Sequence, residues 1–236
     1  MPLTKLAKYI ANLGYGSRRQ VEQLIEQGGV ARADGSRLRD GDSFEHEEVR
    51  VNGEPLDPPA GSVIMMHKPI GYVCSTKDVP PLVYELLPPR FLARTPVMAT
   101  VGRLDRDTSG LLLLTDDGKL NHQLTSPRSH VTKTYVAQLA EPLRGDEIAM
   151  FASGTMMLDS EKEPLAPATL EPIENRLVRV TLHEGRYHQV RRMFAATGNH
   201  VEQLQRVAIG GLALADLEPG QWRVLNDGER AVLLAG

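Results

Sequence analysis

Residues 101–114 read Val101-Gly102-Arg103-Leu104-Asp105-Arg106-Asp107-Thr108-Ser109-Gly110-Leu111-Leu112-Leu113-Leu114. Four leucines follow the polar half at once, and an apolar run of this length is too short for a typical helix and suits a buried strand. Two acids, Asp105 and Asp107, lie beside Arg103 and Arg106. The pattern predicts a polar turn at the mouth of a packed sheet, which is either a functional site or a solvated turn before a strand.

The composition limits the class of protein. The chain has 236 residues, which is enough for one large domain or for a small domain and a larger one, and its hydrophobic content of 41% is enough for a real core. No run of about 18 apolar residues is present, the first residues lack the apolar core of a signal peptide, and Cys74 has no second cysteine to pair with. We therefore expect a cytoplasmic protein that neither binds a membrane nor forms an internal disulfide. A net charge of -3 does not by itself indicate a nucleic-acid ligand.

Residues 1–60 predict a small module with a basic face. Apolar residues at helical spacing, from Leu3 to Leu13, predict a first helix that ends at Gly14. Ser17 and Gln20 form a capping-box pattern at the start of a second helix. The outer surfaces of the two helices carry basic side chains, namely Lys5, Lys8, Arg18 and Arg19. Valines followed by Asn52-Gly53 predict a strand that enters a tight hairpin.

The proline-rich stretch 55–62 predicts a stiff linker, and we place a domain boundary there, between residues 1–60 and 61–236. The larger part contains short strand patterns at 63–66, 133–139 and 177–182, a further strand pattern at 73–76, and helix patterns after 118 and 189. Residues 141–172 predict only a surface helix and loops.

Three motifs in this part resemble those of the RNA pseudouridine synthases, in the branch that modifies ribosomal RNA. The first is Lys68-Pro69-x-Gly71. The second is Gly102-Arg103-Leu104-Asp105-x-x-Thr108-Ser109-Gly110-Leu111, followed by Lys133-x-Tyr135. The third is Glu184-Gly185-x-x-x-Gln189-Val190-Arg191-Arg192-Met193. The residues around Tyr72 and Phe194 are most similar to the RsuA-type branch, which acts on 16S RNA.

The resemblance implies an α+β fold whose catalytic domain has a mixed, mainly antiparallel sheet and a central cleft. It makes Asp105 the catalytic residue, with Arg191 as the partner that opposes the rise in carboxyl pKa caused by burial. Tyr135 would stack on the target base and Leu204 would pack beside it. Arg103 and Lys68 would hold either the phosphate backbone or the motif loops.

Further contacts with RNA are expected from Lys133 and Arg186. The implied reaction is the isomerisation of a flipped uridine, uridine 516 of 16S rRNA by resemblance. The implied partner is 16S rRNA or a small-subunit assembly intermediate, bound by a monomer that needs no cofactor. His183 and His188 lack a third ligand, so we expect no metal.

The first module resembles the S4 RNA-binding module, on Ser17-Arg18-Arg19 and the run to Gly29-Val30. The resemblance implies that Lys5, Arg18 and Arg19 attract phosphates without reading sequence. The alternative is a helical hairpin with an ordinary solvated face, and Arg32, at a position where an apolar strand residue is expected, departs from the pattern.

Other functions remain open at this point. The same chemistry could act on 23S rRNA. A non-catalytic RNA-binding or assembly protein is disfavoured, because binding alone has no use for a carboxylate facing anionic RNA. An aspartic protease, suggested by Asp107-Thr108-Ser109-Gly110, is disfavoured because no second copy supplies the paired acid.

Overall fold

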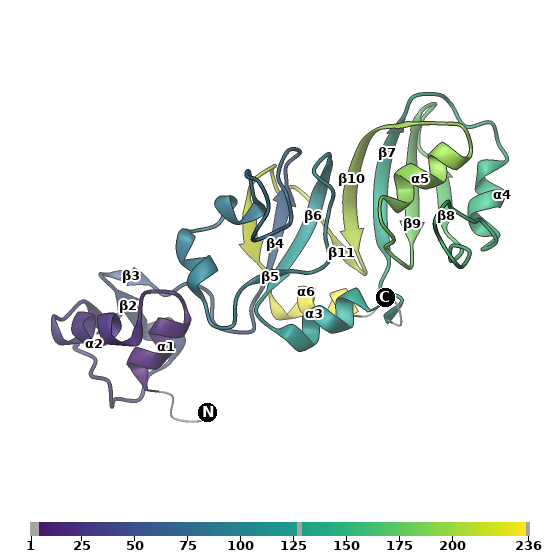
Figure 1. Cartoon of the computed structure of the whole chain (residues 1–236). Helices are drawn as coiled ribbons and strands as arrows, with labels where there is room; N and C mark the ends of the chain where they lie inside the picture. Colours follow the sequence, from purple (N-terminus) through teal and green to yellow (C-terminus); the bar gives the residue numbers. More distant parts are fainter. Residues whose placement is uncertain (1–4, 127–128, 235–236) are drawn as a thin grey trace. The chain divides into compact units, whose positions relative to one another are not determined.

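A computed structural model describes residues 5–126 and 129–234 (Figure 1). The chain forms two compact units, neither of which is continuous in sequence. The first comprises Met1–Ser62, Tyr84–Ala99 and Thr115–Gly118. The second comprises Val63–Val83, Thr100–Leu114 and Lys119–Gly236. Leu3, which was expected to begin the first helix, lies outside the described residues.

The first unit begins with two short helices, α1 (Leu6–Asn12) and α2 (Arg18–Glu26). The predicted capping box is confirmed, because the Ser17 side chain accepts from the backbone of Gln20 while the Gln20 side chain accepts from the backbone of Ser17. The helices pack on a small antiparallel sheet in the order β1-β2-β3, formed by β1 (Val30–Arg32), β2 (Val49–Val51) and β3 (Glu54–Pro55).

The hairpin between β2 and β3 is the predicted one. Asn52 and Gly53 both have positive φ, at 51° and 85°, as a tight hairpin turn requires. A 3-10 turn, η1 (His46–Glu48), precedes β2. Apolar side chains from both helices and the sheet form the core, whereas the side chains expected to meet RNA are exposed, namely Lys5, Lys8, Arg18 and Arg19.

The segment between η2 (Val83–Leu86) and β5 (Ala99–Thr100), which includes η3 (Pro89–Ala93), packs within the first unit. Arg90 forms an ion pair with Asp57, and Arg94 forms a fully buried ion pair of 3.0 Å with Asp116. The backbone of Thr95 donates to the carbonyl of Asn12 at 2.8 Å. Charged side chains in the proline-rich segment therefore hold it in the folded unit.

The second unit contains a mixed sheet in the order β12-β4-β6-β10-β7-β9-β8. Pairing of β6 with β10 is parallel, while β10-β7, β7-β9, β9-β8 and β12-β4 are antiparallel, which confirms a mixed, mainly antiparallel sheet. The strands are β4 (Val63–Lys68), β6 (Thr108–Thr115), β7 (Lys133–Leu139), β8 (Thr169–Pro172), β9 (Leu177–Leu182), β10 (Val201–Ile209) and β12 (Trp222–Val224). β11 (Leu212–Ala213) pairs with β10, and β5 pairs with β6.

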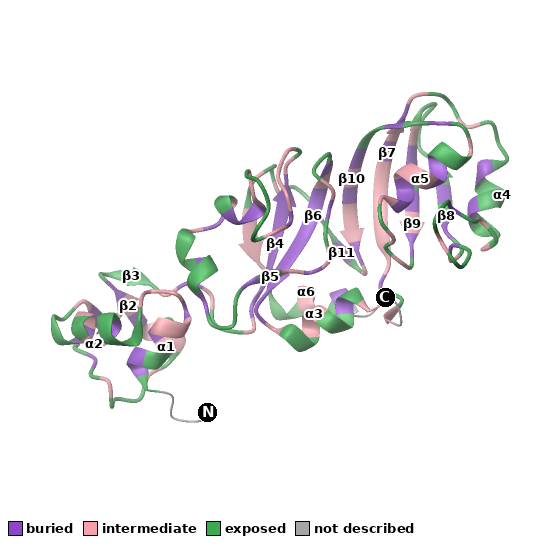
Figure 2. Cartoon of the chain, in the orientation of Figure 1, coloured by how far each residue is buried: buried purple, intermediate pink, exposed green. Residues whose placement is uncertain are grey.

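In the part of the chain that the structure describes, four α-helices accompany this sheet: α3 (Gly118–Thr125), α4 (Glu147–Ala152), α5 (Gln189–Ala196) and α6 (Asp227–Leu234). The run Leu111–Leu114 in β6 is completely buried, as the sequence predicted, and β4 is buried along its length (Figure 2). Gly110 has φ 109°, and a Cβ there would lie 2.2 Å from the carbonyl oxygen of Arg206. A glycine is therefore needed where β6 meets β10.

Two local predictions differ from the structure. Residues 73–76 do not continue as a strand, since Val73 makes only an isolated bridge with Leu82. The segment 141–172, expected to be a surface helix and loops, also contributes the edge strand β8, whose pairing with β9 is non-local. Across residues 5–126 and 129–234, no helix combines the length and apolar character needed to cross a membrane.

Candidate active site

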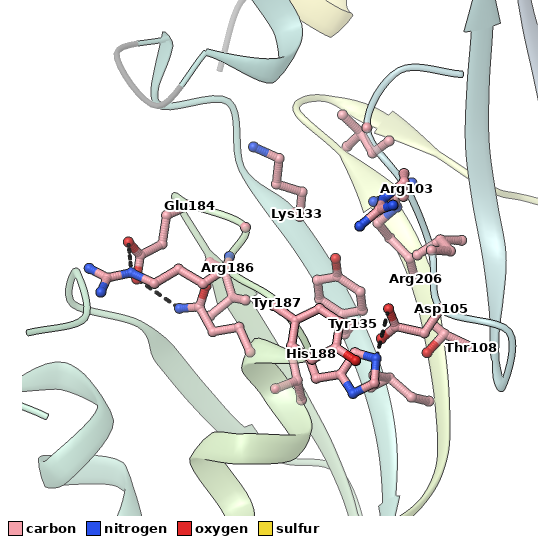
Figure 3. Close-up of a pocket in the computed structure, with 18 of the residues that line it drawn as sticks. Arg103, Asp105, Thr108, Lys133, Tyr135, Glu184, Arg186, Tyr187, His188 and Arg206 are labelled. Atoms are coloured by element: carbon pink, nitrogen blue, oxygen red, sulfur yellow. Dashed lines mark hydrogen bonds and ion pairs between the residues drawn. The ribbon is translucent and has the colours of Figure 1, made fainter. Parts of the chain in front are cut away.

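A cavity of about 380 Å³ opens in the second unit (Figure 3). Its walls come from the polar turn before β6, from β7 and β10, and from the loop that leads into α5. In the close-up, Arg103, Asp105 and Arg206 lie together on one side, whereas Glu184 and Arg186 lie on the other. The polar turn predicted at the mouth of the sheet therefore forms part of a concave site.

Asp105 is partly buried in this cavity, with 31% of its side chain exposed. One carboxylate oxygen, Oδ1, lies 3.3 Å from Nε2 of His188. The carbonyl of Asp105 accepts from the backbone of Thr108 at 3.1 Å, which closes the turn just before β6. Asp105 is thus held by the strand that follows it and by a side chain from the loop before α5.

His188 holds an unusual backbone position, with φ 47° and ψ 33°, immediately before α5. A left-handed conformation is uncommon outside glycine, asparagine, aspartate and histidine. The ring stacks on Tyr187 with centroids 3.9 Å apart and planes 16° apart, while Tyr187 itself remains 68% exposed. The conformation turns the imidazole toward Asp105 and leaves an aromatic surface at the cavity.

The expected pairing of Arg191 with Asp105 is not the one the structure contains. Arg191 lies 2.9 Å from the carboxylate of Asp107 and also donates to the carbonyl of Asp107 at 3.1 Å. A third bond, of 2.8 Å, reaches the carbonyl of Val201. The physical reason is geometric: Arg191 links α5 to both the motif turn and the first residue of β10, and these bonds direct its guanidinium to Asp107.

Tyr135 and Leu204 line the cavity, as their expected roles require. β10 brings them together, because Leu204 lies opposite Thr108 on β6 and Ala137 on β7, and Arg206 lies opposite Tyr135. Lys133 also lines the cavity; burial, reinforced by the charge of Arg206, lowers its pKa below the ordinary lysine value. Residues far apart in sequence thus face one space.

Lys68 lies on β4 and is completely buried, so it is not exposed to a phosphate backbone. Its ammonium donates to the carbonyls of Thr108, at 2.7 Å, and Pro69, at 2.9 Å. Of the two expected roles, the structure therefore favours holding the motif loops. Burial lowers the pKa of Lys68, although the charges of Asp105 and Asp107 oppose this shift.

Arg186 was expected to contact RNA, but its guanidinium is occupied within the protein. It pairs with Glu184 and Glu161, each at 3.1 Å, and donates to the carbonyls of Glu163 and Pro164. Arg186 instead fixes the loop before α5 to the segment that precedes β8. By contrast, Arg103 is exposed at the cavity, where its side chain can meet a ligand in solvent.

Sequence reasoning assigned no role to two side chains in the cavity. His188 was considered only as a possible metal ligand, and Arg206 was given no role. Arg206 is 4% exposed and donates from Nε to the carbonyl of Leu111 at 2.8 Å, while its Nη2 has no hydrogen-bond partner among the described residues. The available signal was the position of Arg206 two residues after Leu204, which places both side chains on the same face of the strand.

No cluster of three or more potential metal ligands occurs in the part of the chain that the structure describes. The cavity is lined by two carboxylates, an imidazole, two tyrosines and several cationic side chains. Its acidic and basic side chains can exchange protons with a ligand, its aromatic rings can stack on a planar ring, and its cations can stabilise negative charge.

Comparison with known proteins identifies the class. The model of the RNA pseudouridylate synthase family matches residues 62–196, and that of the S4 domain matches residues 4–33. The chain belongs to the RNA pseudouridylate synthase family, and the predicted family and S4 module are both confirmed.

Several relatives carry the description ribosomal small subunit pseudouridine synthase A. The protein from Escherichia coli K12 is 48% identical over 191 residues, which cover 79% of this chain and 80% of the relative. That from Pasteurella multocida is 40% identical over 96% of this chain and 98% of the relative. A crystal structure described as a pseudouridylate synthase has a TM-score of 0.69 and 38% identity, over 97% of this chain and 99% of the other.

Proposed function

We propose that this protein isomerises one uridine of 16S rRNA to pseudouridine, with Asp105 as the catalytic carboxylate. The observation that carries the proposal is the position of Asp105, partly exposed in a cavity that Tyr135 and Leu204 also line. The relatives described as small-subunit enzymes support the choice of 16S rRNA, and resemblance to that branch suggests uridine 516.

The reaction needs no oxidant and no second substrate. The bond between C1′ of the ribose and N1 of uracil breaks, the base turns, and a bond forms between C1′ and C5. The proton on C5 is lost and N1 gains one, so the product is an isomer. A carboxylate in an enclosed site suits this work, because it can attack as a nucleophile or accept the C5 proton.

The target uridine must leave its stack to reach Asp105, which costs a few kcal/mol. A cavity of about 380 Å³ lies within the range that small ligands occupy. Stacking on Tyr135 and packing against Leu204 would recover part of the cost. Arg103, exposed at the cavity, is placed to meet the phosphate backbone of the flipped nucleotide, and Lys133 lines the cavity nearby.

The first unit would supply affinity for RNA. Its exposed basic side chains Lys5, Lys8, Arg18 and Arg19 belong to the two helices and their starts. Lys8 and Arg18 also line one shallow hollow, with Asn12, Ser17 and Thr95. Contacts of this kind attract phosphates without selecting a sequence. We expect the protein to act as a monomer on 16S rRNA or on a small-subunit assembly intermediate.

The alternative target is 23S rRNA, with the same chemistry. The test is to incubate the purified protein with transcripts of both rRNAs and with small-subunit assembly intermediates, and to map pseudouridine at single-nucleotide resolution. The proposal predicts one modified uridine in 16S RNA. Modification confined to 23S RNA would show that 23S rRNA is the target instead. The absence of pseudouridine in both transcripts and in the assembly intermediates would indicate a non-catalytic RNA-binding protein.

A further inference from the structure

Arg206 is a buried cation without a carboxylate partner among the described residues. It is 4% exposed, and its Nε donates to the carbonyl of Leu111 at 2.8 Å. Its Nη2 is buried and has no hydrogen-bond acceptor within residues 5–126 and 129–234. Burying a charge is costly unless it is paired, and a buried donor without a partner adds a further cost. A bound ligand that accepted a hydrogen bond from this guanidinium would therefore reduce the energetic cost of burying it.

The strand register brings Arg206 to the place where the base is expected. On β10, Arg206 lies two residues after Leu204, so both side chains project from the same face, and both line the cavity. Arg206 is the direct cross-strand partner of Tyr135 on β7. A ring lying on Tyr135 would consequently have Arg206 at its edge.

The surrounding charges favour a ligand with negative character. The charge of Arg206 contributes to the lowered pKa of Lys133, so the two cations influence each other across the cavity. Of the two acids that line the cavity among the described residues, Glu184 is occupied by Arg186, Gln189 and the backbone of Ala166. The single negative charge of Asp105 does not balance the positive charges of Arg103, Lys133 and Arg206.

We propose that Arg206 donates from its guanidinium to a carbonyl oxygen of the flipped uracil and stabilises the charge that this oxygen gains during the reaction. When the C1′–N1 bond breaks, its electron pair leaves with the uracil and spreads over the ring nitrogens and carbonyl oxygens. The charge disappears when C5 bonds to C1′, and the later loss of the C5 proton is balanced by protonation of N1. A donor that meets more charge in the transition state than in the substrate raises the rate.

The depth of Arg206 distinguishes this partner from a phosphate. An RNA backbone stays at the rim of the cavity, where Arg103 is exposed, whereas Arg206 lies below the surface beside Tyr135. Only the inserted base reaches that depth. The inference rests on the proposed function, since it requires a uridine in the cavity.

The test compares wild type with Arg206→Met and Arg206→Lys, using the full chain and a 16S rRNA fragment. Arg179→Met is the matched control, because Arg179 is exposed on β9 and pairs only with Glu171 among the described residues. The measurements are the single-turnover rate of pseudouridine formation, the Kd for RNA and its salt dependence, and the melting temperature of each variant.

We expect Arg206→Met to reduce the single-turnover rate about 100-fold to 1,000-fold, the cost of removing one such donor. Arg206→Lys should recover part of this rate, and the RNA Kd and its salt slope should stay as in wild type. An unchanged rate would overturn the inference. The inference would also be overturned if Arg206→Met bound RNA more weakly and the slope of its affinity against salt concentration fell by about one, because that change indicates a lost phosphate contact. An inactive wild type would instead contradict the proposed function, and the inference with it.

A second measurement does not depend on how well the variants fold. RNA carrying 2-thiouridine or 4-thiouridine at the target position replaces one carbonyl oxygen at a time with sulfur, a weaker acceptor. Wild-type enzyme should react at least about tenfold more slowly with one of the two RNAs, the rate equivalent of about 1.4 kcal/mol. Both RNAs reacting as fast as uridine would overturn the contact.

Discussion

A guanidinium nitrogen of Arg191 lies 2.9 Å from the carboxylate of Asp107, two residues beyond Asp105. The same side chain donates to the carbonyls of Asp107 and Val201. Arg191 therefore joins the motif turn, α5 and β10 at one point. Its position suits a residue that fixes the turn carrying Asp105, and Asp105 itself faces His188.

Replacing Arg191 should disturb the turn more than replacing Asp107. Arg191→Met removes all three bonds, whereas Asp107→Asn keeps the backbone carbonyl and a polar side chain for Arg191 to meet. We expect Arg191→Met to lower both kcat and the melting temperature, and Asp107→Asn to lower kcat by less than about fivefold, since a partly exposed ion pair contributes about 1 kcal/mol or less. Equal effects in the two variants would contradict this role for Arg191.

Replacing His188 should lower activity without a large change in stability. With φ at 47°, the residue occupies a conformation that costs a non-glycine residue about 1–2 kcal/mol. His188→Gly relieves this cost but removes the contact with Asp105 and the stack on Tyr187. We expect kcat to fall while the free energy of unfolding stays within about 1 kcal/mol of wild type, because the two effects oppose each other. Full activity in His188→Gly would show that the imidazole does not position Asp105.

Lys68 should affect stability in a pH-dependent way. Lys68→Met leaves the carbonyls of Thr108 and Pro69 without their donor, which should destabilise the fold by about 1–3 kcal/mol near pH 7. Because burial lowers the pKa of Lys68 in the folded state, the unfolded chain binds more protons just below the ordinary lysine pKa of about 10.4. Wild type should therefore gain stability relative to Lys68→Met as the pH rises toward that value.

Urea unfolding of both proteins at pH 7 and at a pH just below the ordinary lysine pKa measures this difference. If the difference in the free energy of unfolding between wild type and Lys68→Met became smaller as the pH rises, the pKa of Lys68 would not be lowered in the folded state. Activity should fall in Lys68→Met at either pH, because the ammonium of Lys68 holds the carbonyl of Thr108, at the end of the turn that carries Asp105.

The basic face of the first unit should govern affinity without governing chemistry. Changing Lys5, Lys8, Arg18 and Arg19 to glutamine should weaken RNA binding and reduce the salt slope by up to about one for each phosphate that the protein no longer neutralises. The rate at saturating RNA should be unchanged. Arg39→Gln, an exposed change elsewhere in the same unit, is the control. Wild-type affinity in the fourfold variant would remove the RNA-binding role of this face.

Local patterns predicted much of the fold because they reflect local physics. The capping box at Ser17, the Asn52-Gly53 hairpin, the buried run in β6 and the alternation in β7 each depend on neighbouring residues. The pairing of β8 with β9 and the packing of residues 84–99 in the first unit depend on distant partners. No nearby spacing encodes such contacts.

The same distinction applies to the site. Family motifs identified Asp105, Tyr135 and Leu204, and the structure places all three at one cavity. The partners of the cations were not predictable: Arg186 is held by Glu161, in a segment without a clear pattern, and Arg191 by Asp107. A charged residue's role depends on which opposite charge folding brings to it, and sequence alone does not fix that.

The most direct test of the account is the single-turnover rate of pseudouridine formation by Asp105→Asn on a 16S rRNA transcript, beside wild type and Asp107→Asn. Asparagine keeps the shape of the side chain but supplies neither a nucleophilic carboxylate nor a base. The account predicts no detectable product from Asp105→Asn, RNA affinity within about threefold of wild type, and an active Asp107→Asn. A rate of about one tenth of wild type or more in Asp105→Asn would contradict it.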